Sequence, residues 1–260
     1  MYYIVFDLEF NQGYNFENEP ENIINPKCPF EIIQIGAVKL DDNFKTIGAL
    51  DIIVKPEIYT RINPFVQELT GITMDDLDKG KSFKEMYKEL SEFFKSDSSV
   101  LCVWGMVDIK ELFRNIEYYG LDSSIVPTEY INIQACASKS LNCQKGINIG
   151  LGNAADLLTI PIEGQLHNAF NDAHYTAEVF KKIYSSEIKA KVYIPHKSTN
   201  LKRSNDQKYK IDYYNLINQF EKMYNREITQ EEKSIIKLAY IMGKTNQFQI
   251  KIVSDPIGKK

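Results

Sequence analysis

The chain has 260 residues, of which 43% are hydrophobic and 25% are charged. This composition is typical of a globular protein with a core of its own, so folding alone requires neither a disulfide nor a metal. The net charge of −4 argues against a general nucleic-acid coat protein, because phosphate binding usually leaves a basic surface. It does not exclude an enzyme whose divalent cations screen the substrate phosphates.

Three features favour a cytoplasmic protein without a membrane partner. The N-terminal sequence lacks the basic segment and the small-residue cleavage site of a signal peptide. No apolar run approaches the roughly 18 residues that a membrane span needs. The four cysteines include no pair at the two-residue spacing of zinc or redox sites, which predicts reduced structural thiols.

Strands dominate the first part of the chain. Residues 2–6 form an apolar run rich in β-branched and aromatic side chains, which predicts a buried strand. Residues 11–30 are rich in Asn, Glu and Pro and predict a long loop, a kind of segment that often serves as a lid or binding loop. Two further strands, 32–40 and 47–54, are separated by turn-forming residues and predict an antiparallel hairpin.

Helices and short strands alternate after the hairpin. A helix is expected over 64–69 and should end at Gly71, and capping boxes begin at Thr73 and Ser82. The second capping box opens an amphipathic helix. The later elements expected are a strand at 100–104, a helix at 108–119, a strand at 130–133, and helices near 148–158 and 168–184. This order predicts a mixed α/β sheet with helices on both faces.

The composition changes at residues 188–210, where seven basic residues accompany one Asp. We therefore predict a main domain over 1–187, a basic linker over 188–210 and a mostly helical appendage over 211–260. The elements expected in the appendage are helices at 211–224 and 230–243 and a strand near 248–252.

Asp7 and Glu9 stand two residues apart in the first strand, so their carboxylates face the same side. Two like charges are costly to bury unless they bind a metal, so a divalent-cation site and a water-exposed sheet edge are equally good interpretations. Asp108 begins a helix after a buried strand, where Asp is more often a helix cap than a ligand. The two roles are compatible, because such helices also present their N-termini to active sites.

Asp172 lies near the start of the last helix of the main domain, five residues after His167. Its charge could complement the helix dipole, and His167 could be a surface or packing residue. His174, inside the helix, is the rival candidate for a catalytic base. The four carboxylates could hold two Mg²⁺ or Mn²⁺ ions roughly 4 Å apart, with a histidine accepting a proton from water.

The acidic residues belong to a set of motifs in a fixed order. The motifs are Ile4-Val5-Phe6-Asp7-Leu8-Glu9-Phe10, Glu31–Val38, Leu69-Thr70-Gly71-Ile72, Trp104–Asp108 and His167–Ala173. Over residues 1–185 they resemble the DnaQ-like Asp-Glu-Asp-Asp exonuclease superfamily in its histidine-containing subclass. The long segment before Glu31, the 130–133 element and the Gly150-Leu151-Gly152 turn are similar to the Eri-type exoribonucleases and their KapD-like bacterial relatives.

The resemblance implies an RNase H-like fold with a five-stranded mixed sheet and two-metal hydrolysis that releases nucleoside 5′-monophosphates from a 3′ end. The catalytic metal ligands that it implies are Asp7, Glu9, Asp108 and Asp172. It also implies that His167 is the catalytic general base. The substrate-binding residues that it implies, against the terminal base and sugar, are Phe10, Leu69 and Thr70.

Two residues depart from the family pattern. Gln34 stands where many relatives have Glu. The residue at this position is not a usual metal ligand in the family, so the change should tune the surroundings of the site. Asn168 stands where relatives often have Arg, which puts one phosphate contact in doubt. The basic run at 188–210 lies outside the resemblance, and a guide for a nucleic-acid strand and a solvated linker are equally good interpretations of it.

The sequence thus predicts a metal-dependent 3′-to-5′ exonuclease that acts on the 3′ end of single-stranded nucleic acid, with RNA favoured over DNA. Two alternatives stay open: a non-catalytic regulatory or nucleic-acid-binding module on the same fold, and a proofreading-type DNA exonuclease. A protein tells RNA from DNA through a contact to the 2′-hydroxyl, and the sequence does not place that contact.

Overall fold

The computed structural model describes residues 1–14, 24–95, 98–144, 146–195 and 213–230, together with residues 232, 233, 235, 236 and 239. The chain divides into two compact units, residues 1–197 and 198–260. The domain boundary between 187 and 188 stays a prediction. Among the described residues, no helix is long and apolar enough to cross a membrane.

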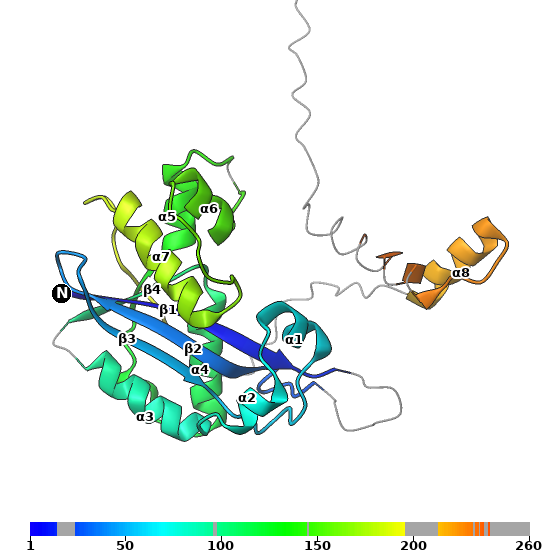
Figure 1. Ribbon diagram of the computed structural model, residues 1–260, viewed down its shortest axis with the longest axis horizontal. Helices are drawn as coiled ribbons and strands as arrows, with labels where there is room; N and C mark the ends of the chain where they lie inside the picture. Colours follow the sequence, from blue (N-terminus) through cyan, green and yellow to red (C-terminus); the bar gives the residue numbers. More distant parts are fainter. Residues whose placement is uncertain are drawn as a thin grey trace, which may run out of the picture. The chain divides into compact units, whose positions relative to one another are not determined.

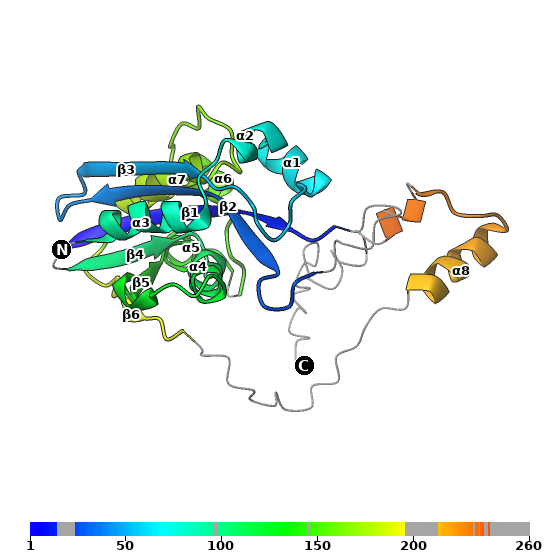
Figure 2. The same ribbon diagram turned by 90° about the horizontal axis from the view of Figure 1, so that it is seen from below.

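A six-stranded mixed sheet runs through the first unit (Figures 1 and 2). Its strands are β1 Tyr2–Gln12, β2 Phe30–Leu40, β3 Thr46–Ile53, β4 Ser99–Val103, β5 Glu129–Asn132 and β6 Lys191–Val192. They lie in the order β3-β2-β1-β4-β5-β6. Strand β1 pairs antiparallel with β2 and parallel with β4, and β2 and β3 form the antiparallel hairpin that the sequence predicts.

Helices cover both faces of the sheet, as the sequence predicts (Figures 1 and 2). The described helices of this unit are α1 Pro64–Thr70, α2 Met74–Asp78, α3 Phe83–Phe94, α4 Val107–Tyr118, α5 Ile133–Ser140, α6 Leu151–Leu157 and α7 Ala169–Ile183, with a 3₁₀ turn at Ser123–Ile125. Ile4 and Phe6 of β1 pack in one core with α3 and α4, whereas Tyr3 and Val5 pack in another with α5, α6 and α7. The two-residue period of a strand therefore turns Asp7 and Glu9 toward the α7 side.

Local sequence signals set several helix boundaries. Pro64 occupies the first turn of α1, and Gly71, with a φ of 73°, ends that helix. Thr73 and Ser82 both form the capping boxes that the sequence predicts, at the starts of α2 and α3. In the second unit, α8 spans Tyr213–Tyr224, within the helix predicted at 211–224.

The sheet has one strand more than the five that were expected. Strand β6 comes from the start of the segment predicted as a linker, and its residues pair antiparallel with Glu129 and Tyr130 of β5. Its two residues are exposed and carry no periodic pattern, so backbone pairing alone makes the strand. Helix α5 was also missed, because the Asn132 side chain starts it directly at the end of a strand by accepting a hydrogen bond from the Ala135 N–H.

Other expectations are shifted or lie outside the described residues. Strand β1 runs to Gln12, past the predicted end at Phe6, and shortens the predicted loop. Residues 15–23 of that loop and the predicted strand at 248–252 lie outside the described residues. The predicted helix at 230–243 is described only in part, although Thr229 and Glu232 form its capping box.

Candidate metal and catalytic centre

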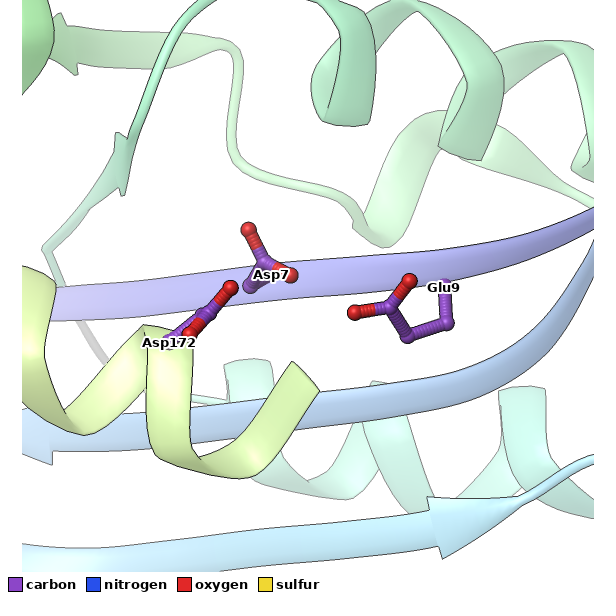
Figure 3. Close-up of side chains that lie close together, drawn as sticks. All are labelled: Asp7, Glu9 and Asp172. Carbon is purple, nitrogen blue, oxygen red and sulfur yellow. The ribbon is translucent and has the colours of Figure 1, made fainter. Parts of the chain in front are cut away.

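Strand β1 places two carboxylates on the face of the sheet that α7 covers. Asp7 pairs in register with Gly36 of β2, and Glu9 pairs with Gln34. One carboxylate oxygen from each of Asp7, Glu9 and Asp172 lies within 4.8 Å of the other two (Figure 3). Glu9 is only 9% exposed, so the interpretation of this face as a water-exposed sheet edge is wrong. Oxygens this close together can share one divalent cation.

Helix α7 brings Asp172 to β1 because its first turn lies directly on β2. The Asn168 side chain caps the helix by accepting a hydrogen bond from the backbone N–H three residues on. Gly36 allows the close approach, since a methyl group built on it would lie 2.2 Å from both the Ala169 C and the Phe170 N atoms. The position of Asp172 therefore depends on a glycine in a different element.

Gln34 forms a second link between β2 and the start of α7. Its Oε1 accepts a hydrogen bond from the Ala169 N–H at 3.1 Å, and its Nε2 donates to Asp51 Oδ1 at 2.8 Å. The first N–H groups of a helix have no partner within the helix, and the Gln34 amide satisfies one of them. It does so without placing another negative charge near the carboxylates. The expectation that this position tunes the surroundings of the site stays a prediction.

Asp108 reaches the same region from the β4 side. It is the second residue of α4, which follows β4, and it is buried. Burial raises the pKa of both Asp7 and Asp108, and hydrogen bonding from the Leu8 backbone offsets part of that rise in each, so the two carboxylates adjoin the same amide. Met106 occupies the N-cap position of α4, so Asp108 is not the helix cap.

The four carboxylates lie in surroundings that oppose their charge. Burial is the largest cause in each case, and it raises the pKa of Glu9 to about 8 and that of Asp108 to about 7. The pKa values of Asp7 and Asp172 are also raised by burial, and the charges of neighbouring acids raise those of Asp7, Glu9 and Asp108 further. A buried cluster of like charges is costly without a positive partner, so the arrangement suits a cation.

The carboxylate of Asp172 gives an independent indication of such a site. Its Oδ2 accepts a hydrogen bond from the His167 N–H at 3.2 Å, whereas its Oδ1 is buried and has no hydrogen-bond partner among the described residues. A buried polar atom without a partner calls for an ion or water. Carboxylate oxygens suit hard cations such as Mg²⁺ and Mn²⁺, so Asp7, Glu9 and Asp172 fit a divalent ion.

The two candidate histidines differ in their relation to this cluster. His167 is exposed, immediately precedes the cap of α7, and has a φ of 62°, a left-handed conformation that is unusual for a non-glycine residue. Burial raises the pKa of Asp172, and the hydrogen bond from the His167 backbone offsets part of that rise. His174 is exposed on α7, and its ring meets that of Tyr175 at 5.6 Å. The His167 backbone contacts Asp172, so His167 is the better candidate of the two for a proton acceptor at this cluster.

The residues expected to bind substrate lie around α1 and the end of β1. The Phe10 ring lies 6.2 Å from the Phe30 ring and packs against the core beneath α3 and α4. The Thr70 hydroxyl donates to the Val66 carbonyl and accepts from the Ile72 N–H, so it is engaged in ending α1. Leu69 is half-buried. Substrate contacts by Phe10, Leu69 and Thr70 stay predictions.

Sequence reasoning missed three residues that support the site: Gly36, Asn171 and Tyr175. A glycine inside an apolar strand indicates close approach of another backbone, so the position of Gly36 could have been used. Asn171 and Tyr175 contact the loop that carries His167. No spacing signal reveals them, because Tyr175 reads as one more apolar residue on the inner side of α7.

Comparisons with known proteins match most of the first unit. The family model of the RNase T exonucleases matches residues 4–180, more than half of the chain. The chain is 24% identical to the probable 3′-5′ exonuclease KapD of Bacillus subtilis (strain 168) over 69% of this chain and 83% of that protein. It is 23% identical to the ERI1 exoribonuclease 3 of Homo sapiens, over 60% of this chain and 48% of the relative, so it spans about half the length of that protein.

Solved structures share the fold at low identity. The nuclease domain of 3′hExo, a DEDDh family member bound to rAMP, has a TM-score of 0.62 at 20% identity and covers 74% of this chain and 97% of its own. A 3′-exonuclease that recognises a histone mRNA stem-loop has a TM-score of 0.60, and E. coli ExoI in complex with single-stranded DNA has 0.52. With the family match and the acidic centre, these likenesses lead to one conclusion. The chain belongs to the RNase T exonuclease family and is a 3′-to-5′ exonuclease of the DEDDh type.

Proposed function

We propose that the chain removes nucleotides one at a time from the 3′ end of single-stranded RNA and releases nucleoside 5′-monophosphates. The observation that carries the proposal is the convergence of Asp7, Glu9 and Asp172 within 4.8 Å, with Asp108 adjoining them. We propose that these four carboxylates hold two Mg²⁺ or Mn²⁺ ions. Such ions, when bound, would activate a water and stabilise the leaving 3′-oxygen.

In this proposal the other residues of the site accept a proton or hold the terminal nucleotide in place. His167 accepts the proton of the attacking water on its exposed imidazole. The hydrogen bond from its backbone N–H to Asp172 ties the His167 backbone to the carboxylate cluster. The terminal nucleotide lies against Phe10 and the Leu69-Thr70 segment, where the half-buried Leu69 offers an apolar surface to the base.

RNA is the proposed substrate because several similar proteins are exoribonucleases or bind RNA. ERI1 exoribonuclease 3 is one of them, and the 3′-exonuclease with the histone mRNA stem-loop is another. E. coli ExoI, which was solved with single-stranded DNA, supports the DNA alternative, at a lower TM-score. The choice between the two substrates therefore needs a direct comparison.

Matched RNA and DNA oligonucleotides labelled at the 5′ end test the proposal. With Mg²⁺ or Mn²⁺, the protein should shorten the RNA stepwise from the 3′ end, release nucleoside 5′-monophosphates, and act faster on RNA than on DNA. EDTA should stop the reaction. Asp7→Ala is the control for contaminating nuclease. Intact RNA and DNA with both metals would contradict the exonuclease proposal, whereas faster DNA digestion would contradict only the substrate.

Replacing His167 should separate the proposed base from the metal site. His167→Asn is expected to lower kcat by about 10²- to 10⁴-fold, the usual contribution of a general base. Asn tolerates the left-handed backbone at this position, so the thermal unfolding midpoint should change little. His174→Asn, the same change on the exposed side of α7, is the matched control and should keep its activity. Equal kcat values for the two variants would exclude His167 as the base.

A further inference from the structure

The loop that carries His167 is tied to α7 at three points. The Tyr175 hydroxyl accepts hydrogen bonds from the Glu163 N–H at 3.1 Å and from the Gly164 N–H at 2.7 Å. One turn earlier, Asn171 Nδ2 donates to the Gln165 carbonyl at 2.9 Å. The third tie is the bond from the His167 N–H to Asp172. Residues 171, 172 and 175 lie on one side of the helix, and together they hold the loop along its length.

Close packing on other sides supports the same arrangement. A methyl group built on Gly164 would lie 2.7 Å from Asn171 Nδ2 and 3.2 Å from the Tyr175 hydroxyl, so the loop rests directly on both side chains. A methyl group built on Gly152 of α6 would lie 3.1 Å from Leu166 Cδ1. The loop is thus wedged between α6 and α7, and its last residue is the strained His167.

The Tyr175 ring and its hydroxyl have different roles: the ring fills the core, and the hydroxyl binds the loop. The side chain is 6% exposed, and its ring packs in the core beneath α5, α6 and α7. Phenylalanine would fill that core equally well, so the hydroxyl serves the loop rather than the packing. Two backbone N–H groups on one acceptor fix the orientation of the peptide planes ahead of His167.

We propose that Tyr175, assisted by Asn171, is a positioning residue that holds the His167 loop in its catalytic conformation. The inference rests on the proposed function, because it assigns to His167 the role of the base. Tyr175 does not touch the carboxylates in this role; it acts through the loop. A displacement of about 1 Å in a reacting group can cost about a hundredfold in rate, so a loosened loop should lower kcat without altering the metal ligands.

Tyr175→Phe tests the proposal by a double-mutant cycle with His167→Asn. In the wild-type background, Tyr175→Phe should lower kcat by about tenfold to a hundredfold. The KM and the metal concentration at half-maximal activity should stay unchanged. In the His167→Asn background, the same change should have no further effect, because the residue it positions is gone. Tyr184→Phe is the matched control, since among the described residues the hydroxyl that it removes contacts the Tyr3 hydroxyl and not the His167 loop.

Amide hydrogen exchange gives a readout that does not depend on activity. The amides of Glu163 and Gly164 should exchange faster in Tyr175→Phe than in the wild type and at wild-type rates in Tyr184→Phe. Asn171→Ala, which removes the tie to Gln165, is a second variant and should lower kcat in the same non-additive way. It keeps the inference testable even if Tyr175→Phe folds poorly.

The outcomes separate the inference from the proposed function. Unchanged kcat in Tyr175→Phe, or a loss that multiplies with that of His167→Asn, would overturn the positioning role while leaving the exonuclease proposal intact. Unchanged exchange at Glu163 and Gly164 would overturn it too. A wild-type protein inactive on both oligonucleotides would contradict the proposed function, and the positioning role inferred for Tyr175 would fall with it.

Discussion

Glu9→Gln is expected to stabilise the metal-free protein at pH 8 and to remove most of the stabilisation that Mg²⁺ or Mn²⁺ gives the wild type. The reason is the buried acidic cluster, in which burial and the charges of Asp172 and Asp108 raise the pKa of Glu9 to about 8. That shift corresponds to at most about 5 kcal/mol, at about 1.4 kcal/mol per pKa unit, and relaxation of the site should leave about half of it.

The pH dependence has a definite sign. Between pH 4.5, the ordinary pKa of a Glu carboxyl, and about 8, the folded chain holds a proton on Glu9 that the unfolded chain has lost. The free energy of unfolding of the metal-free wild type therefore falls as the pH rises through this window. Glutamine does not titrate, so the advantage of Glu9→Gln should be small below pH 4.5 and largest above pH 8.

Metal should remove most of the stability difference between the two proteins. Binding requires deprotonated carboxylates, so stabilisation of the wild type by metal should grow with pH and reach about 2.7 kcal/mol at a hundredfold excess over Kd. Urea unfolding at pH 5 and pH 8, in EDTA and in Mn²⁺, measures both effects. Glu89→Gln, which removes a surface ion pair with Lys81, is the control. A wild type that loses no more stability than Glu9→Gln between these pH values would contradict the prediction.

The acidic centre could be predicted from the sequence because its members stand out locally. Asp7 and Glu9 interrupt an apolar strand at the two-residue spacing that puts them on one face. Asp108 lies in the first turn of α4, which comes directly after strand β4, and Asp172 lies in the first turn of α7, which packs on the sheet. These patterns involve only residues that are neighbours along the chain. The resemblance to a family was needed to predict that the four acids form one site.

The supporting contacts could not be predicted, because they join residues far apart in the chain. Gln34 and Ala169 are separated by 135 positions, and their hydrogen bond leaves no periodic trace in either segment. The role of the Tyr175 hydroxyl could not be predicted either, because a tyrosine on the inner side of a helix is common in protein cores. Strand β6 depends on backbone pairing alone. The sequence thus indicates which residues carry charge, whereas packing decides how they are held.

Gly36→Ala is expected to destabilise the fold by about 3 kcal/mol and to lower kcat by about a hundredfold or more. The new methyl group would lie 2.2 Å from the Ala169 C atom, so either β2 or the first turn of α7 must move. The obstacle is backbone, which cannot rotate away as a side chain can. Because Asp172 is in that first turn, the shift would carry one carboxylate away from Asp7 and Glu9.

Gly48→Ala provides the matched control in the neighbouring strand. A methyl group there would lie 3.3 Å from a side-chain atom of Phe93 and 3.7 Å from Lys39 Cβ, and side chains can adjust by that amount. Its cost should stay within about 1 kcal/mol, with activity retained. Urea unfolding and kcat measured for both variants decide the matter. If Gly36→Ala were as stable and as active as Gly48→Ala, the close contact between β2 and α7 would not be what sets the position of Asp172.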